Sequence, residues 1–245
     1  MTDLHDELRR WWDTDARTYD RAPTHVMRSP AERAAWTAAI ERSLPEPPAR
    51  VLDAGAGTGF LSLVCARLGH RAAALDLSDG MLGKLRAAAA RDGLDVEIAH
   101  GPAEEPPPGP FDAIVERHLL WTLPDPLGAL KSWRAAAPEG RLALFEGLWG
   151  AADPLERARQ RARDALRRVR GHADDHHAPY DPGMRARLPL GAGTHPGHVI
   201  ELVEEAGWRN VTIERLRNVE WARRLALPIP ERALGVTPLF VVRAR

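Results

Sequence analysis

The stretch from Val51 to Phe60 holds the residues best suited to binding a ligand. Two apolar residues lead into Asp53, glycines follow at positions 55, 57 and 59, and a helical run continues to Leu68. A strand that turns tightly into a helix leaves backbone N–H groups pointing at whatever lies above it, and glycine lets a ligand approach that backbone with no Cβ in the way. The pattern predicts a nucleotide-binding turn.

The spacing of this turn separates two kinds of nucleotide. A dinucleotide turn reads Gly-x-Gly-x-x-Gly and needs its third glycine for close packing of helix on strand. Counted from Gly55, that place is held by the bulky Phe60, and the chain reads Asp-x-Gly-x-Gly-x-Gly instead. We expect Asp53 to repel a pyrophosphate and to attract the ammonium group of an amino acid.

This stretch resembles motif I of the class I S-adenosylmethionine-dependent methyltransferases. A second passage, Phe111–Pro126, resembles the fourth-strand region of small-molecule methyltransferases of the ubiquinone/menaquinone-methylase superfamily, and Pro138-Glu-Gly140 matches the turn before their fifth strand. The resemblance covers roughly residues 10–245. It implies S-adenosyl-L-methionine as cofactor and methyl transfer to a small molecule as the reaction.

Alternating strands and helices must position these residues. The apolar stretches predicted as strands begin at Val51 and then cover 71–76, 96–100, 111–116, 141–145, 211–216 and 239–242. With the resemblance they imply an α/β, Rossmann-like class I methyltransferase fold, whose mostly parallel seven-stranded sheet has an antiparallel C-terminal edge. We expect a single domain over 1–245, made of an N-terminal helical cover (1–45), a cofactor-binding core (50–147), a substrate-covering insertion (148–196) and a C-terminal helix and strands (197–245).

The N-terminal cover is predicted to contain two helices. The first, over 3–19, carries apolar residues at steps of three and four, and the second begins at the N-cap Ser29 and runs to about Leu44. A helix before the nucleotide domain either closes over the ligand or simply packs on the core. The resemblance places Tyr19 near the sulfonium of the cofactor.

Asp76, which closes the second strand, is the predicted ribose ligand. A carboxylate is a two-oxygen acceptor and a ribose diol is a paired donor. The family commonly has an Asp after the glycine that follows the third strand, but here that place is Pro102, so adenine recognition is expected from Ala103, Glu104 or shape. The full set of predicted cofactor-binding residues is Tyr19, Asp53, Gly55, Gly57, Gly59, Asp76, Leu77, Met81, Ala103, Glu104, Glu116 and Arg117.

His118 is the predicted catalytic residue. Ligands of an open parallel sheet bind beyond the carboxyl ends of its strands, and His118 follows the fourth strand there. Imidazole titrates near neutral pH, so His118 either acts as a base or only positions the acceptor. The predicted substrate-binding residues are His25, Trp121 and Trp149.

The insertion carries two further patterns. An arginine-rich helix is expected to start at Asp153-Pro154, and it is either a basic lid for an anionic acceptor or a soluble amphipathic helix. Three histidines and two acids follow within 171–177. They either ligate a divalent metal or belong to a solvated or substrate-lining loop. Their spacing is not that of a zinc motif, and we predict no metal site.

The amino-acid composition argues against some classes of binding partner. Lys+Arg and Asp+Glu both number 34, a balance that argues against a nucleic-acid or anionic-membrane binder. The chain has one cysteine, Cys65, and no apolar signal core or 18-residue apolar run. We therefore expect a reduced, cytoplasmic protein that is a monomer or a homodimer.

Four functions remain open from the sequence. The first is methylation of nitrogen or oxygen on a small molecule in natural-product biosynthesis. The second is carbon methylation of a quinone-like or isoprenoid acceptor, and the third is a non-catalytic S-adenosylmethionine-binding protein. The fourth, a hydride-transferring dehydrogenase, is opposed by Phe60, by Asp53 and by the absence of a Tyr-x-x-x-Lys pair.

Overall fold

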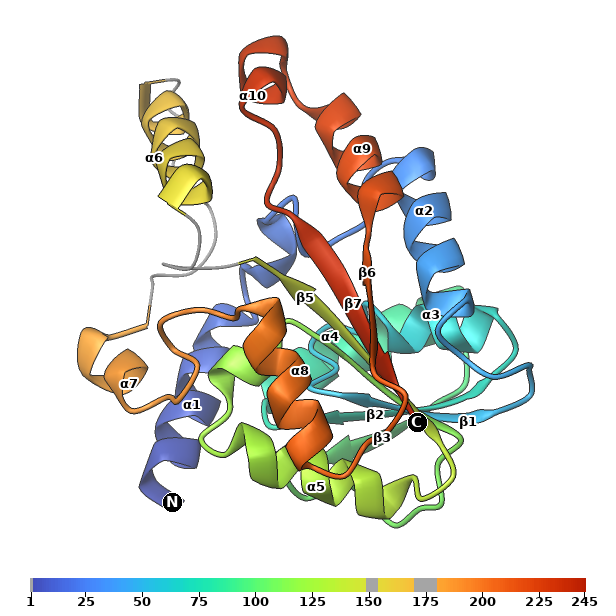
Figure 1. The fold of residues 1–245 in the computed structure, drawn as a ribbon. Coiled ribbons are helices and arrows are strands. Elements are labelled where there is room, and N and C mark those ends of the chain that lie inside the picture. Colours follow the sequence, from blue (N-terminus) through green and yellow to red (C-terminus); the bar gives the residue numbers. More distant parts are fainter. Residues whose placement is uncertain (1, 149–153, 170–179) are drawn as a thin grey trace.

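A single seven-stranded sheet organises the computed structural model, which describes residues 2–148, 154–169 and 180–245 (Figure 1). The strand order is β3-β2-β1-β4-β5-β7-β6. The first five strands pair in parallel, whereas β7 is antiparallel to both β5 and β6. This arrangement confirms the predicted fold class. The strands are β1 (Arg50–Ala54), β2 (Arg71–Asp76), β3 (Val96–His100), β4 (Ala113–Arg117), β5 (Arg141–Gly147), β6 (Thr212–Arg215) and β7 (Leu239–Ala244).

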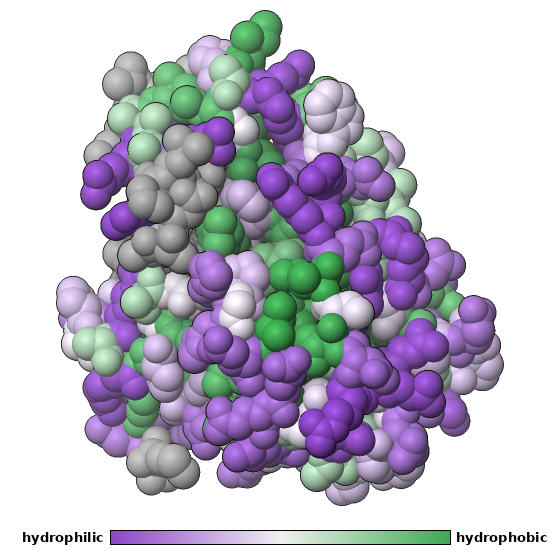
Figure 2. All heavy atoms as spheres, viewed as in Figure 1, coloured by the Kyte–Doolittle hydropathy of each residue, from purple (hydrophilic) through white to green (hydrophobic). Residues whose placement is uncertain are grey.

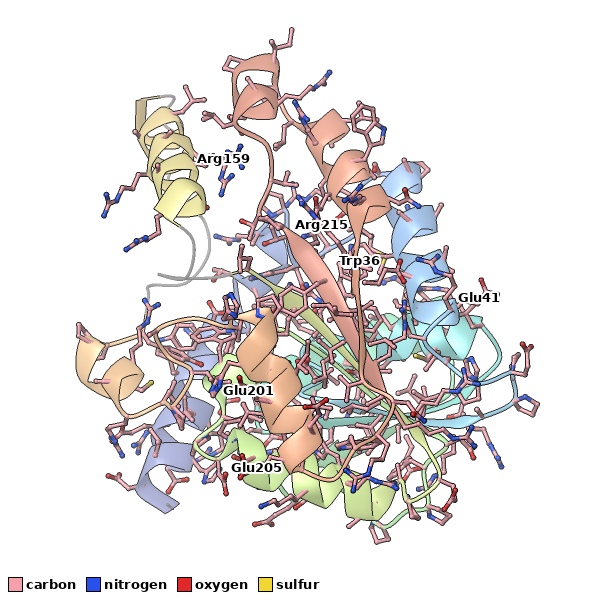
Figure 3. All side chains as sticks on the ribbon, viewed as in Figure 1. Trp36, Glu41, Arg159, Glu201, Glu205 and Arg215 are labelled. Atoms are coloured by element: carbon pink, nitrogen blue, oxygen red, sulfur yellow. The ribbon has the colours of Figure 1, made fainter. Side chains whose placement is uncertain are left out.

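Helices cover both faces of the sheet, as near-continuously buried parallel strands require. The helices α2 (Pro30–Glu41), α3 (Ser62–Arg67), α4 (Asp79–Asp92) and α9 (Arg217–Ala226) pack on one face. On that face Trp36 is fully buried between α2 and the sheet (Figure 3). The helices α5 (Pro126–Ala136) and α8 (Pro196–Glu205) pack on the other, where Trp133 and Trp208 are fully buried. Glu201 and Glu205 lie on the exposed side of α8 (Figure 3).

The N-terminal segment crosses the sheet edge where β1, β2 and β4 end. It consists of α1 (Thr2–Asp15) and a single 3-10 turn, η1 (Tyr19–Arg21), so the first helix is shorter than the predicted 3–19. Leu4 and Leu8 of α1 pack with Tyr180 and Leu188, beside the short helix α7 (Pro182–Ala186).

Serine side chains cap the starts of two helices, and one of them, Ser29, was predicted as an N-cap. The hydroxyl of Ser29 accepts from the N–H of Glu32, and that of Ser78 accepts from the N–H of Met81. Such side-chain caps satisfy N–H groups that have no partner inside the helix. Ser78 thereby fixes where α4 begins, directly beyond Asp76.

The arginine-rich helix of the insertion is α6 (Pro154–Val169), which lies beside α10 (Ile229–Leu234) (Figure 1). Arg163 is its one buried residue among those whose side chains are described, and it donates to the carbonyls of Leu234 and Gly235. Ala158, Ala162 and Ala165 are exposed, so these three positions of the predicted apolar face do not pack on the core. The prediction that 148–196 covers the substrate therefore remains a prediction.

The face shown in Figure 2 is mostly hydrophilic, with hydrophobic residues gathered near its centre and over α10. The exposed large hydrophobic side chains are Ile213, Trp221, Leu225 and Ile229. Within the described residues, no helix combines the length and the hydropathy needed to span a bilayer.

Candidate active site

A cavity of about 670 Å³, including its open mouth, lies at the carboxyl ends of β1, β2 and β4. The strand order reverses between β1 and β4, and ligands of open α/β sheets bind at such a switch point. Six chain segments form the wall, and their residues are His5, Leu8, Trp12, Tyr19, Gly55, Gly57, Asp76, Leu77, Met81, Pro102, Ala103, Glu104, Arg117, His118, Leu119, Thr122, Leu123 and Pro124.

The glycine turn forms the floor of this cavity. Gly55 and Gly57 have φ of +67° and +55°, values that L-residues other than glycine rarely adopt. A Cβ built on Gly57 meets nothing within 4 Å, whereas one on Gly55 would lie 2.5 Å from Cδ1 of Leu119. The backbone at Gly57 is therefore open to a ligand.

Asp76 joins this turn to the next helix. Its Oδ2 accepts from the N–H of Gly57 at 2.7 Å, and its Oδ1 accepts from the N–H of Ser78 at 2.8 Å. Burial raises the pKa of Asp76 to about 6, against the lowering effect of these two N–H donors. Each oxygen keeps a second lone pair for a ligand on the cavity side.

Asp53 lies below the turn instead of in the cavity wall. Its Oδ2 accepts from the N–H of Ser62 at 2.8 Å and from the Ser62 hydroxyl, so the buried acid holds the start of α3. Burial raises the pKa of Asp53 to about 7. The structure gives Asp53 a role in fixing the turn that its sequence position alone did not reveal.

Tyr19 enters the cavity wall from η1. Its ring stacks on His25 with centroids 3.8 Å apart, and Nδ1 of His25 lies 2.8 Å from the Tyr19 carbonyl oxygen. Burial raises the pKa of the Tyr19 hydroxyl. The neighbouring Asp20 accepts from the hydroxyl of Thr58 at 2.8 Å and lies 3.3 Å from Nζ of Lys84, so η1 is attached directly to the glycine turn.

Helix α1 closes one side of the cavity with His5, Leu8 and Trp12. Three contacts hold it there. Asp13 Oδ1 accepts from the Ser78 hydroxyl at 2.6 Å and from the Gly80 N–H at 3.1 Å, and His5 Nε2 lies 3.3 Å from Glu104 Oε1. Of the two interpretations left open by the sequence, this position favours a helix that closes over a ligand.

The loop after β3 contributes Pro102, Ala103 and Glu104. Trp133 donates its indole N–H to the Ala103 carbonyl at 2.7 Å, and Ala103 itself is buried. The carbonyl is thus already used inside the protein, and Glu104 is the acceptor side chain that this loop offers.

Arg117 is the last residue of β4 and is 9% exposed. Its guanidinium lies 3.9 Å from the centroid of the Phe60 ring, and its NH1 donates to the Thr24 carbonyl at 3.4 Å. Burial lowers its pKa, and nearby Tyr19 and Asp53 partly oppose that shift. Phe60, the residue that rules out the dinucleotide pattern, thus packs against a cation in the wall.

His118 follows Arg117 with φ of +60°, in the left-handed region. Such a conformation costs a non-glycine residue about 1–3 kcal/mol and clusters at functional sites. Burial lowers the pKa of His118 well below its usual value, and the charge of Arg117 lowers it further, so the imidazole is neutral at pH 7. A neutral imidazole has one nitrogen able to accept a proton.

Two buried carboxyl groups lie behind His118. Glu146 Oε2 is 3.6 Å from His118 Nδ1. Glu116 Oε2 accepts from the Leu119 N–H at 2.8 Å. Burial raises the pKa of Glu146 to about 8, and burial together with the charge of Glu146 raises that of Glu116 well above its usual value.

Most of the predicted site residues meet at this cavity. Its wall includes Tyr19, Gly55, Gly57, Asp76, Leu77, Met81, Ala103, Glu104, Arg117 and His118. Asp53, Gly59 and Glu116 lie outside the wall, as do His25 and Trp121, whose rings contact those of Tyr19 and Tyr180. Trp149 lies outside the described residues.

Sequence reasoning missed the residues supplied by α1 and by the turn after β4. They are His5, Leu8, Trp12, Leu119, Thr122, Leu123 and Pro124, and behind the wall Glu146. The spacing of four residues between Leu4, Leu8 and Trp12 indicated one buried face of α1, but it did not indicate that this face meets a ligand. Among the described residues, no three His, Cys, Asp or Glu side chains gather as they would around a metal, and 171–177 lie outside those residues.

The amino-acid sequence is similar to those of known methyltransferases. Residues 27–183 match a family model described as a methyltransferase domain. The ubiquinone biosynthesis O-methyltransferase of Xanthomonas campestris pv. campestris is 33% identical over 139 residues, which are 55% of this chain and 55% of that protein. The chain thus spans about half the length of the curated relatives it matches.

Two solved structures resemble the whole chain. Phosphoethanolamine N-methyltransferase 2 of Haemonchus contortus in complex with S-adenosyl-L-methionine has a TM-score of 0.62 and 16% identity, covering 98% of this chain and 59% of that one. Magnesium protoporphyrin IX methyltransferase of Synechocystis with bound SAH has a TM-score of 0.61 and 12% identity, covering 99% of both chains. At sequence identities this low, the similarity to these two structures concerns the fold alone.

Proposed function

Because this chain belongs to the methyltransferase-domain family, we propose that it transfers a methyl group from S-adenosylmethionine to an oxygen or nitrogen atom of a small molecule in natural-product biosynthesis. One observation carries the proposal. The glycine turn after β1, the acid that ends β2 and the histidine after β4 border a single cavity. A redox dinucleotide is disfavoured there, because Phe60 occupies the place of the third glycine and packs beneath Arg117.

The residues present fit this cofactor. Asp76 offers free lone pairs to a ribose diol, Gly57 leaves open space beside it, and Leu77 and Met81 supply apolar wall for an adenine. Arg117 supplies a buried cation for the carboxylate of an amino acid. We also propose that Asp53, when it is ionised, attracts the ammonium group of the cofactor from below the glycine turn.

His118 is proposed as the base. When bound, S-adenosylmethionine supplies an electrophilic methyl group on a sulfonium centre. His118 is neutral because burial and Arg117 lower its pKa, so one of its two nitrogens can accept the proton that an acceptor hydroxyl must lose. The remaining residues of the wall act by holding the acceptor in line with the methyl group, an effect worth up to ~7–11 kcal/mol.

The wall also indicates the class of acceptor. Trp12 and Tyr19 present aromatic surface to the cavity, which suits a flat molecule. A buried base helps a hydroxyl group most, because a hydroxyl must lose its proton to become a good nucleophile, whereas a neutral amine can attack with its lone pair. The similarity to an O-methyltransferase of ubiquinone biosynthesis supports the same atom. We therefore place phenolic hydroxyl groups first among the acceptors.

The zero net charge supports an activity without nucleic acid. We further propose that the protein works in the cytoplasm as a monomer or a homodimer.

Two measurements test the proposed function. Calorimetric titration with S-adenosylmethionine, S-adenosylhomocysteine and NAD identifies the cofactor, and transfer of a labelled methyl group to a panel of phenols, catechols and amines identifies the reaction. We expect binding of both sulfur nucleosides, no binding of NAD and product from a phenol. Binding of NAD alone would overturn the proposal, and sulfur-nucleoside binding without product across the panel would favour a non-catalytic protein.

The base is tested with His118→Asn. Asparagine tolerates the left-handed backbone better than alanine does, so this variant removes the imidazole with little change in fold. Loss of a general base lowers the rate by roughly 10²–10⁴-fold. Unchanged affinity for S-adenosylhomocysteine is the control. A rate loss under about tenfold would leave His118 as a wall residue.

A further inference from the structure

Glu146 is the side chain behind His118 that the proposed mechanism leaves without a role. It lies at the end of β5, is 1% exposed, and both of its carboxyl oxygens are enclosed by protein. Its Oε2 is 3.6 Å from Nδ1 of His118, which is itself enclosed. The imidazole forms part of the cavity wall and its Nδ1 is enclosed, so Nε2 is taken as the nitrogen that faces the ligand.

We propose that Glu146 is a positioning residue that sets which nitrogen of His118 carries the proton, so that Nε2 can accept a proton only when Glu146 is ionised. The inference rests on the proposed function of this site. The 3.6 Å separation is longer than a hydrogen bond, and such contacts often tighten only when the ligand is bound.

The two states follow from hydrogen-bond chemistry. A protonated Glu146 donates its O–H to Nδ1, which leaves the imidazole proton on Nε2, where it blocks proton acceptance. An ionised Glu146 accepts from Nδ1–H, and the Nε2 lone pair then faces the acceptor. Because burial raises the pKa of Glu146 to about 8, the protonated state dominates at pH 7 and the base-competent state appears as the pH rises through 8.

The charges around the pair are consistent with this order. Arg117 on β4, Arg223 on α9 and His25 before α2 all lower the pKa of His118, so the imidazole stays neutral while Glu146 titrates. Arg117 also lowers the pKa of Glu146, but less than burial raises it. Burial, and after it the charge of Glu146, likewise raise the pKa of Glu116 well above its usual value.

The step balances without a further reactant. An acceptor O–H gives its proton to Nε2, its oxygen forms the bond to the methyl carbon, and the carbon–sulfur bond breaks with its electron pair going to sulfur. His118 becomes an imidazolium, whose Nδ1–H faces the carboxylate of Glu146. That carboxylate stabilises the new cation.

The test is a pH titration of His118 by ¹⁵N NMR of the imidazole nitrogens, assigned by their loss in His118→Asn. It is recorded on ligand-free protein and again with S-adenosylhomocysteine, so it does not depend on finding an acceptor. We expect Nδ1 to change from unprotonated to protonated between about pH 7 and 9 in the wild type. Glu146→Gln should remove that change, because a glutamine does not titrate.

Two further variants keep the result decisive. Glu116→Gln removes the other buried carboxyl group and should leave a His118 titration in place, because Glu116 Oε2 accepts from the Leu119 N–H whereas Glu146 is the carboxyl group at Nδ1. Glu146→Asp keeps an ionisable group and should restore a titration at a shifted midpoint, even if the glutamine variant folds poorly. A single tautomer of His118 from pH 6 to 9.5 in the wild type, or an unchanged titration in Glu146→Gln, would overturn the inference.

The outcomes separate this inference from the proposed function. Failure to bind S-adenosylhomocysteine or to methylate any acceptor would remove the function but would leave the titration readable. Methyl transfer with no tautomer change would keep the function and remove the role of Glu146. With an active phenol in hand, the wild-type rate should rise through pH 8, and Glu146→Gln should lower it roughly 10²–10⁴-fold at pH 8.5.

Discussion

The carboxylate of Asp76 accepts a hydrogen bond from the backbone N–H of Gly57 at 2.7 Å, so the end of β2 fixes the shape of the turn after β1. The two residues predicted from separate motifs therefore act as one unit. Asp76 has one oxygen on Gly57 and the other on Ser78, and it faces the cavity between them. Several consequences of this geometry can be measured.

Asp76→Asn should weaken the binding of S-adenosylhomocysteine roughly 10–100-fold, because hydrogen bonds to a charged group contribute about 1.5–3 kcal/mol. The amide nitrogen of asparagine would also face the N–H of Gly57 or of Ser78, with no acceptor there. Calorimetry at pH 7.5 gives the affinity. In the wild type the affinity should fall as the pH drops below about 6, where Asp76 takes up a proton, and the variant should show no such fall.

Substitution of the two wall glycines should have opposite main effects. Gly57→Ala costs ~1–2 kcal/mol in the free energy of unfolding for its left-handed backbone, but its Cβ points into open space and should mainly obstruct the ligand. Gly55→Ala pays the same backbone cost and also places a Cβ 2.5 Å from Leu119, so it should lose more stability. Thermal melts and calorimetry on both variants measure the difference. Wild-type affinity in Gly57→Ala would place the ligand elsewhere.

Stability should fall as the pH rises from about 4 to about 7, and Asp53 is one cause. Its pKa is 3.8 in the unfolded reference and about 7 when buried, so the folded state holds a proton that the unfolded state has already lost. The free energy of unfolding then decreases by up to about 1.4 kcal/mol per pH unit in that window. Asp53→Asn removes this dependence and keeps an oxygen for Ser62. We therefore expect denaturant melts to show that Asp53→Asn gains in free energy of unfolding relative to the wild type at pH 8 but not at pH 5.

Asp13→Ala should loosen α1 over the cavity. The change removes the acceptor of the Ser78 hydroxyl and the Gly80 N–H, which hold α1 against the start of α4. Hydrogen exchange of the α1 amides should speed up, and S-adenosylhomocysteine should dissociate faster. Asp6→Ala is the matched control, because Asp6 lies on the same helix and forms a solvent-exposed ion pair with Arg9. Equal exchange in the two variants would contradict this role of Asp13.

The sheet and the site floor were predictable because their signals are local. A run such as Arg71–Asp76 is apolar and ends in an acid, and the glycines at 55, 57 and 59 are separated by single residues. Parallel strands then bring their carboxyl ends to one edge without further information. Ser29 and Ser78 were recognisable as caps for the same reason, since a cap depends on three or four consecutive residues.

The cover and the buried acids were not predictable in this way. His5 meets Glu104 across 99 positions of sequence, and Glu146 reaches His118 from a neighbouring strand. Nothing in the apolar spacing of β5 distinguishes a buried carboxyl group from one in solvent. The helix α9 was missed because its sequence is rich in arginine, and only its packing on α2 identifies its inner face. Asp53 was correctly singled out, but its bonds to Ser62 depend on how α3 begins.

The presence of His5 and Leu8 in the cavity wall has a practical consequence for labelling the protein. A bulky probe attached to α1 near His5 would compete with a ligand for space. A probe at the exposed Glu201 of α8 would lie outside the wall. Helix α8 is therefore the better place for a label in ligand titrations.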